Sequence, residues 1–323
     1  MTKLGLEEKV VDEKVLKKTV ERFRQRKIKL PTFDELRDPS KISDDIKKQL
    51  KDVDPNEPHP LNLYRINWFN NEKGNDFADT PDYVVIPKEI SGTRAPIVVL
   101  VGAYFPMVQC HKVLAAYGCL APRVITGQFD PTTHKAIWPS TGNYCRGGVA
   151  VSRIMDCHGV AILPEEMSKE RFNWLQKWTL DPKEDIYATP GCESNVKEIY
   201  DKCNELDKEE QNIIFNQFCE FGNALIHYHA TGYAAEKVFE DFQKSNPNAK
   251  ARCFVSATGS AGTLSAGDYL KEKFNGLQIA AVEALECPTL LYNGFGGHNI
   301  QGIGDKHVPY VHNVMNTDFA IGV

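Results

Sequence analysis

The sequence at residues 256–267 reads S-A-T-G-S-A-G-T-L-S-A-G, a glycine-rich turn between an apolar run and a run with helical spacing. Residues 253–257 predict a short buried strand, and residues 264–274 predict a helix. The glycines let the backbone approach an anion, and the helix start supplies N–H groups that attract one. Ser260 and Thr263 add hydroxyl donors. The segment indicates an α/β protein with a phosphate-binding turn, although such turns also serve as simple connections.

Strand and helix signals alternate along the chain from residue 95 onward. The alternation predicts an α/β fold with mostly parallel, twisted sheets, because parallel strands need crossover helices and are covered by helices on both faces. The strand candidates are residues 97–101 (buried), 124–125, 137–138, 160–163, 185–188, 253–257 and 278–285. The helix candidates are residues 112–117, 144–157, 168–178, 194–206, 230–243 and 264–274.

The first 59 residues have a different character. Residues 6–26 carry apolar side chains near helical spacing among many Lys and Glu residues, which predicts an amphipathic helix. Thr32 and Glu35 form a capping-box pattern for a second short helix, and three prolines from residue 55 to residue 60 end the segment. We interpret residues 1–59 as an N-terminal helical extension used for packing or dimer contacts, with a regulatory role as the alternative.

Composition limits the function classes. The 323 residues, 42% of them hydrophobic, are enough for about two domains. A formal charge of -5 provides no basic surface for nucleic acid, and the longest apolar run, residues 95–101, is too short to cross a bilayer. The nine cysteines lie at uneven intervals, form no C-x-x-C pair and do not cluster near spaced histidines. This pattern indicates reduced thiols and no metal site. We therefore expect a cytoplasmic protein that contacts neither membrane nor nucleic acid.

A second polar loop reads S-T-G-N at residues 140–143 and precedes a helix that contains Gly147 and Gly148. Hydroxyl groups and backbone donors at a helix start suit a carboxylate. The alternative interpretation is a polar N-cap turn followed by glycines that permit close helix packing.

Taken in order, these motifs resemble those of fold-type II pyridoxal-phosphate enzymes. They are S-T-G-N with R-G-G-V-A, then G-S-A-G-T, then G-G-H-N-I-Q-G-I-G at residues 296–304. Q-F at 217–218, Asn223, H-Y at 227–228 and T-G at 231–232 look like the cysteine synthase and cystathionine β-synthase branch. The similarity covers about residues 60–310 and implies a tryptophan synthase β-like fold. Its larger, cofactor-binding domain would comprise residues 60–98 plus 222–323, and residues 99–221 would form a smaller domain that carries the 140–143 loop.

In the family a lysine about thirty residues before the asparagine loop, at the start of a helix after a strand, binds the cofactor covalently. Lys112 lies 31 residues before Asn143 and follows the predicted strand at 97–101. Lys135 is the competitor, but it lies eight residues before Asn143, too close for an intervening helix and strand. We therefore prefer Lys112. Its context, C-H-K-V-L, departs from the family's small residue before the lysine and Asp and Arg after it.

The resemblance implies roles for the other motif residues. Asn143 would hydrogen-bond the 3′ oxygen of pyridoxal 5′-phosphate. The cofactor's phosphate would be held by Gly259, Ser260, Ala261, Gly262 and Thr263. The substrate would be bound by Ser140, Thr141, Gly142, Gln217 and Gly302. The lysine must be neutral to act as a nucleophile and base, so a buried site that lowers its pKa is expected.

The implied reaction is β-replacement on a small amino acid through an aminoacrylate intermediate, as in cysteine synthesis from O-acetylserine or a similar compound and sulfide. Tyr144 and Arg146 instead favour β-elimination, as in a cysteine desulfhydrase or an amino-acid ammonia-lyase. Relatives place a serine at the pyridine nitrogen near the C-terminus, and we expect this partner beyond Val323. That expectation leaves an inactive cofactor-binding subunit as a further alternative. Relatives suggest a homodimer.

Overall fold

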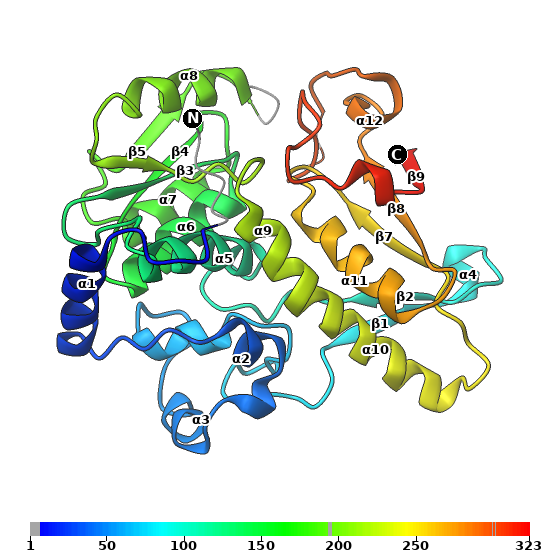
Figure 1. Cartoon of the computed structure of the whole chain (residues 1–323). Coiled ribbons are helices and arrows are strands. Elements are labelled where there is room, and N and C mark those ends of the chain that lie inside the picture. Colours follow the sequence, from blue (N-terminus) through cyan, green and yellow to red (C-terminus); the bar gives the residue numbers. More distant parts are fainter. Residues whose placement is uncertain (1–6, 193–195, 299, 301) are drawn as a thin grey trace.

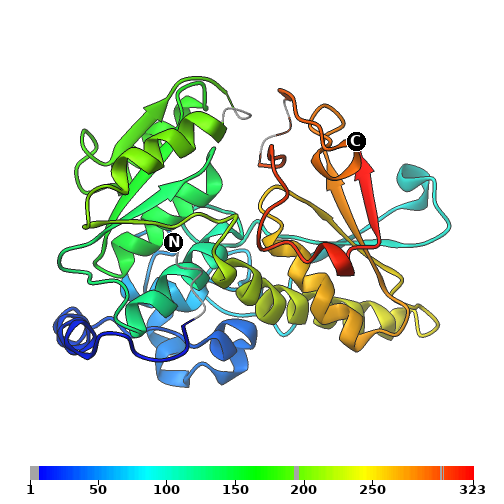
Figure 2. The same cartoon turned by 45° about the horizontal axis from the view of Figure 1, so that its top comes forward.

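Two parallel sheets form the framework of the molecule, and they lie on opposite sides of the long helical segment formed by α9 and α10 (Figures 1 and 2). The computed structural model describes residues 7–192, 196–298, 300 and 302–323. One sheet has the order β5-β4-β3-β6 and the other the order β7-β8-β9. The strands are β3 (Lys135–Pro139), β4 (His158–Pro164), β5 (Ile186–Thr189), β6 (Asn212–Ile214), β7 (Cys253–Ala257), β8 (Gln278–Glu283) and β9 (Phe319–Gly322). The predicted α/β class with mostly parallel sheets is confirmed.

Helices connect the strands and separate the sheets. The helices are α1 (Glu13–Gln25), α2 (Phe33–Arg37), α3 (Asp44–Leu50), α4 (Lys88–Ser91), α5 (Lys112–Ile125), α6 (Asn143–Ile154), α7 (Lys169–Trp178), α8 (Val196–Leu206), α9 (Phe221–Ile226), α10 (Gly232–Ser245), α11 (Ser265–Lys273) and α12 (Thr289–Tyr292). The four-stranded sheet lies within residues 99–221 and the three-stranded sheet within residues 222–323. The division into two domains itself stays a prediction. No helix in the described ranges is long and apolar enough to cross a membrane.

Helix α5 is the centre of the main core, because its side chains are buried over nearly the whole helix. Close helix crossings depend on glycine at two places. A Cβ on Gly222 of α9 would lie 2.2 Å from the carbonyl oxygen of Gly118 in α5, and a Cβ on Gly147 of α6 would lie 2.9 Å from the carbonyl oxygen of Lys112. These crossings bring the starts of α5 and α6 together with the segment before α9.

The structure differs from two of the predicted elements. Residues 124–125 are the end of α5 rather than a strand, because Val124 continues the buried face of that helix. The amphipathic helix predicted over residues 6–26 begins at Glu13, where the Asp12 side chain accepts hydrogen bonds from the N–H groups of Lys14 and Val15. Residues 6 and 194, the predicted starts of two helices, lie outside the described residues.

Two strands are less buried than predicted. β2 (Ile97–Leu100) pairs antiparallel with β1 (Tyr83–Ile86) in a two-stranded ribbon instead of joining a parallel sheet, and Ile97 and Val99 are exposed. β7 has the predicted bounds, but its alternate residues, among them Val255, are exposed. Phe319 and Ile321 of β9 are exposed on the same side. Within the described residues, helices therefore cover one face of the three-stranded sheet and leave the other face open.

The N-terminal segment packs onto both sides of the molecule. Thr32 and Glu35 make the predicted capping box at the start of α2. Lys18 of α1 forms an ion pair with Asp130 at 2.8 Å, on the side of the four-stranded sheet. From α2, Arg37 donates to the hydroxyl oxygen of Tyr269 in α11 at 3.1 Å, on the side of the three-stranded sheet. The expected packing role is thus visible, and a dimer or regulatory role stays untested.

Candidate active site

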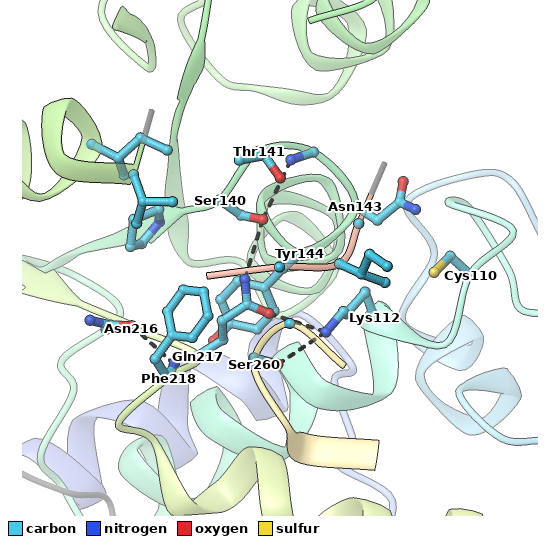
Figure 3. A pocket seen from close by; sticks show the side chains of 18 of the residues that line it. Cys110, Lys112, Ser140, Thr141, Asn143, Tyr144, Asn216, Gln217, Phe218 and Ser260 are labelled. Atoms are coloured by element: carbon cyan, nitrogen blue, oxygen red, sulfur yellow. Dashed lines mark hydrogen bonds between the residues drawn. The ribbon is translucent and has the colours of Figure 1, made fainter. Parts of the chain in front are cut away.

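A cavity of about 210 Å³ lies where the carboxyl ends of β3 and β7 and the loop after β6 meet the starts of α5 and α6 (Figure 3). Ligand sites of parallel α/β sheets are common at this edge. The predicted residues that line it are Lys112, Ser140, Thr141, Gly142, Asn143, Gln217, Gly259, Ser260 and Gly302. Ala261, Gly262 and Thr263 continue the glycine-rich turn behind the cavity wall. The structure thus brings together residues that are spread over the sequence from Lys112 to Gly302.

Lys112 is the first residue of α5, and its amine points into the cavity. Its Nζ donates to Gln217 Oε1 at 3.1 Å and to Ser260 Oγ at 3.2 Å. Burial lowers the pKa of Lys112 from its usual value of 10.5, because desolvation disfavours the charged amine. Lys135 begins β3 at the end opposite Ser140 and does not line the cavity. The preference for Lys112 over Lys135 therefore agrees with where the two amines lie.

Gln217 connects the lysine to the polar loop of the four-stranded sheet. Its Nε2 donates to Ser140 Oγ at 3.3 Å while its Oε1 accepts from Lys112 (Figure 3). Asn223 holds this residue in place, since its Nδ2 donates to the Gln217 carbonyl oxygen at 3.0 Å and to Ser260 Oγ at 3.3 Å. The sequence identified Asn223 only as part of a motif. Its bridging role depends on contacts across three segments, which no local pattern reveals.

The turn after β7 presents backbone donors to the cavity. Within the described chain, the N–H groups of residues 259–263 donate no hydrogen bond. Ala261 has a φ of 63°, and this left-handed residue turns the chain into the short helical turn before α11. A Cβ on Gly262 would lie 2.1 Å from Asn223 Oδ1, so only glycine fits there. Consecutive free N–H groups at a helix start form a concave site for a phosphate-sized anion.

The loop before α6 presents a second set of donors. Gly142 precedes the helix, and no side chain caps the first N–H groups of α6. Arg171 of α7 supports the loop, since its Nη1 donates to the Thr141 carbonyl oxygen at 2.9 Å. A Cβ on Gly142 would lie 2.6 Å from Arg171 Cζ. The sequence did not single out Arg171, because it reaches the loop from the helix after the next strand.

A buried histidine, His227, and a half-buried one, His111, adjoin the lysine. The rings of His111 and His227 lie 5.4 Å apart, and His227 Nδ1 is 2.7 Å from Thr231 Oγ1, which also accepts from Trp68 Nε1. Burial, followed by the nearby Lys112, lowers the pKa of His111 to about 3. Burial also lowers the pKa of His227, with His111 and Lys112 adding to the effect. Both rings are therefore neutral at physiological pH, which avoids two further positive charges beside Lys112.

Comparisons with known proteins give a consistent relationship. No protein-family model matches the chain. A cysteine synthase from Staphylococcus aureus is 30% identical over 181 residues, which cover 56% of this chain and 54% of that protein. The chain thus spans about half the length of the curated relatives it matches.

Solved structures extend the likeness over more of the chain. A hydrogen sulfide-producing enzyme from Fusobacterium nucleatum superposes with a TM-score of 0.65 and 23% identity over 80% of this chain and 78% of that one. An O-acetylserine dependent cystathionine beta-synthase from Helicobacter pylori superposes with a TM-score of 0.65 and 19% identity over 76% of each chain.

The paired sheets, covered by helices, are the fold-type II architecture that the motifs predict. Within that class the chain is a relative of the cysteine synthases, and the predicted resemblance to this branch is confirmed.

Proposed function

We propose that this chain is a pyridoxal 5′-phosphate enzyme that replaces the β-substituent of a small amino acid, with O-acetylserine or a similar compound and sulfide as reactants. The observation that carries the proposal is the position of the Lys112 amine, which lies between the turn at residues 259–263 and the loop at residues 140–143. The relationship to cysteine synthases supports the same reaction class. The reaction of the whole protein is part of the proposal.

The residues present fit the cofactor. The free N–H groups of residues 259–263 and the Ser260 hydroxyl provide donors for a phosphate at a helix start. The half-buried Lys112 would provide the amine that such a cofactor binds covalently, and Asn143 lines the same cavity. When bound, the group would act as an electron sink that acidifies the substrate's Cα–H bond.

The chain's own side chains would share the remaining tasks. Lys112 would hold the cofactor and, once released, remove the α-proton, and its lowered pKa favours the neutral form of the amine that both steps need. The 140–143 loop would bind the substrate carboxylate with its backbone donors, assisted by Gln217. Gly302, whose φ is +85°, would form the opposite wall without a side chain to block the substrate.

Tyr144 lends little support to the β-elimination alternative. Its ring is fully buried and packs edge-on against Trp138 at 5.4 Å, so it serves the core as well as the cavity wall. We keep β-replacement as the proposed reaction. We also propose a homodimer as the working form and the cytoplasm as its compartment, where reducing conditions suit an odd number of cysteines.

Spectroscopy and product analysis test the proposal. Purified protein mixed with pyridoxal 5′-phosphate should gain the absorption band of the covalently bound cofactor, which should be lost in Lys112→Ala and kept in Lys135→Ala. Supplied with O-acetylserine and sulfide, the loaded protein should form cysteine. Pyruvate as the main product would instead establish elimination, and a cofactor band without turnover would indicate an inactive subunit.

A further inference from the structure

A second cavity, the small cavity, lies beside the glycine-rich turn. It offers about 10 Å³ to the centre of a water-sized sphere, which is room for a ligand of about the size of one water molecule. Gly259 and Gly304 line both the small cavity and the larger one that Lys112 lines. The small cavity is therefore a separate compartment that shares a wall with the candidate active site.

Two polar side chains that line the small cavity, Thr258 and His312, have an atom without a hydrogen-bond partner. They are only 7% and 9% exposed, and Thr258 Oγ1 and His312 Nδ1 have no partner among the described residues. Burial lowers the pKa of His312, so its ring is neutral. His312 Nε2 lies 2.9 Å from Thr317 Oγ1, whose hydroxyl donates to the Asn313 carbonyl oxygen. Nε2 must then carry the ring proton, which leaves Nδ1 as an acceptor without a donor.

Two buried carboxyl groups, those of Glu283 and Asp305, line the same cavity. Glu283 accepts from the N–H groups of Leu290 and Leu291 at 3.0 Å and 2.9 Å, and Asp305 accepts from the N–H group of Lys306 at 2.7 Å. A carboxylate has further lone pairs, so both groups can accept more hydrogen bonds. Neither forms an ion pair within the described ranges. Buried charges are normally paired, so the small cavity has capacity for a cation.

The basic residues that follow Asp305 do not provide this cation. Burial raises the pKa of Asp305, and the backbone N–H groups and the charges of Lys306 and His307 act to lower it. Lys306 Nζ lies over the ring of Phe295, 5.1 Å from its centroid, and His307 is exposed. Within the described chain neither side chain forms an ion pair with Asp305.

The groups around the small cavity favour a charged hydrogen-bond donor. His312 Nδ1 and both carboxylates are acceptors, and the Thr258 hydroxyl can also accept. Water carries no charge and offers fewer donors than ammonium, which has about the same size. No group of His, Cys, Asp and Glu side chains in the described part of the chain could hold a metal ion. Ammonium therefore matches the small cavity better than water or a metal ion does.

We propose that the small cavity binds one ammonium ion, which donates hydrogen bonds to the side chains of Asp305, Thr258 and His312. The proposal goes beyond the proposed function, because it does not depend on a reaction at Lys112. The ion would strengthen an existing contact between two segments of the active-site wall, since the Gly304 N–H group donates to the Thr258 carbonyl oxygen at 3.1 Å.

Urea unfolding of the cofactor-free protein tests the ammonium site. The measurement is made at about pH 7.5, where Asp305 is ionised. Ammonium chloride should raise the urea midpoint in a saturable manner, because a ligand that binds only the folded chain stabilises it. Tetramethylammonium chloride, which has no N–H group, should have no such effect at the same ionic strength. Absence of a saturable effect of ammonium overturns the proposal.

Asp305→Asn removes the carboxylate and should weaken the apparent ammonium affinity by about tenfold or more. The amide keeps the shape of the side chain and buries no charge. Glu286→Gln is the matched control, because it removes the same charge from an exposed residue nearby and should respond to ammonium as the wild type does. Wild-type ammonium affinity in Asp305→Asn contradicts the proposal.

A second pair of variants keeps the test decisive if Asp305→Asn does not fold. Thr258→Val removes the hydroxyl acceptor at nearly constant volume and should bind ammonium several-fold more weakly. Thr258→Ser retains the hydroxyl and should keep most of the affinity. Equal ammonium affinity in the two variants refutes the site.

Potassium chloride separates a donor site from a general cation site. Potassium has about the radius of ammonium but offers no N–H group, so the affinity for ammonium should be about tenfold higher. Equal stabilisation of the wild type by potassium and ammonium would show that the small cavity selects charge alone, against the proposal.

The shared wall predicts that ammonium affects the larger cavity. Pyridoxal 5′-phosphate, titrated by absorbance, should bind the wild type several-fold more tightly with ammonium present, and Asp305→Asn should lose this gain. The cofactor should tighten ammonium binding by the same factor. Cofactor affinity that ammonium leaves unchanged would refute the coupling. If the cofactor does not bind at all, the proposed function fails, whereas the urea experiment still decides the ammonium site.

Discussion

Asp305 is a buried carboxyl group whose ionisation makes the stability of the folded chain depend on pH. Its carboxyl group follows Gly304 of the cavity wall and is 6% exposed. Burial raises the pKa of Asp305 from 3.8 to about 6, although the N–H groups of Lys306 and His307 act to lower it. Because the folded pKa lies above the unfolded value, the native chain holds an extra proton in this window. The associated stabilisation is present below about pH 4 and is lost as the pH rises through about 6.

We predict that Asp305→Asn stabilises the protein at neutral pH and leaves it unchanged near pH 4. The amide keeps the shape of the carboxylic acid and cannot ionise. The shift in pKa corresponds to a gain of up to about 3 kcal/mol in the free energy of unfolding. Urea unfolding of both proteins at the two pH values measures the difference. An identical difference at both pH values would show that ionisation of Asp305 does not carry the effect.

At the scale of elements, a buried ion pair joins α5 to the segment that presents Gln217. Arg123 of α5 contacts both carboxylate oxygens of Glu220, at 2.6 Å and 3.3 Å, and the two side chains are 4% and 1% exposed. Glu220 directly precedes α9 and lies three residues after Gln217. The pair therefore fixes the distance between the start of α9 and the helix that carries Lys112.

We predict that Glu220→Ala destabilises the protein by about 3–5 kcal/mol, because it removes the carboxylate that neutralises the buried Arg123 charge. The double variant Arg123→Met with Glu220→Leu should recover most of this loss, since it buries no charge. The free energy of unfolding in urea measures both effects. A double variant as unstable as the single one would mean that packing, and not the orphaned charge, causes the loss.

The crossing of α5 and α9 leads to a second prediction at this scale. In Gly222→Ala the new methyl group would lie 2.2 Å from the Gly118 carbonyl oxygen, so the helices must move apart. The expected loss of stability is about 1–3 kcal/mol, with weaker cofactor binding because Lys112 and Gln217 separate. Leu225→Ala, on the exposed side of α9, is the control and should change stability by less than about 0.5 kcal/mol. Equal effects of the two variants would contradict this account of the crossing.

The sequence predicted elements well where the local signal was strong. The bounds of β7 follow from an apolar run followed by a glycine-rich turn, and the start of α2 from its capping box. β6 was missed because three residues carry no periodicity, and residues 124–125 were misassigned because a buried helix is apolar on all sides. The burial of strands was overestimated because it depends on what covers the sheet.

The candidate site could be predicted as far as its residues belong to local motifs. Lys112, Asn143 and the 259–263 turn each stand at a strand-to-helix connection, which composition reveals. Asn223 and Arg171 act through contacts with distant loops, and a single sequence carries no signal for such contacts. The assignment of roles to these residues stays a prediction until the variants are measured.

At the scale of the whole molecule, the segment around α2 joins the two sides that the cavity separates. On one side, the Tyr117 hydroxyl in α5 donates to the Pro31 carbonyl oxygen at 2.6 Å. On the other, the Arg37 guanidinium lies 4.6 Å from the ring centroid of Tyr233 and donates to Tyr269. Cofactor binding would add a second connection, because the residues proposed to bind the cofactor come from both sides of the cavity. Either the α2 segment or the bound cofactor should therefore be enough to make the two sides unfold together.

We predict that Arg37→Met uncouples the two sides in the cofactor-free protein and that pyridoxal 5′-phosphate restores the coupling. Trp138, Trp174 and Trp178 lie within residues 99–221, and Trp68 packs into the core around α5, so fluorescence mainly follows the side of the four-stranded sheet, whereas far-ultraviolet circular dichroism follows both sides. The two urea transitions should coincide in the wild type, separate in Arg37→Met, and coincide again with cofactor at about 100 times its Kd, which adds about 2.7 kcal/mol. Arg24→Met, an exposed change in α1, serves as the control and should behave as the wild type. Coincident transitions in cofactor-free Arg37→Met would show that contacts other than that of Arg37 couple the two sides.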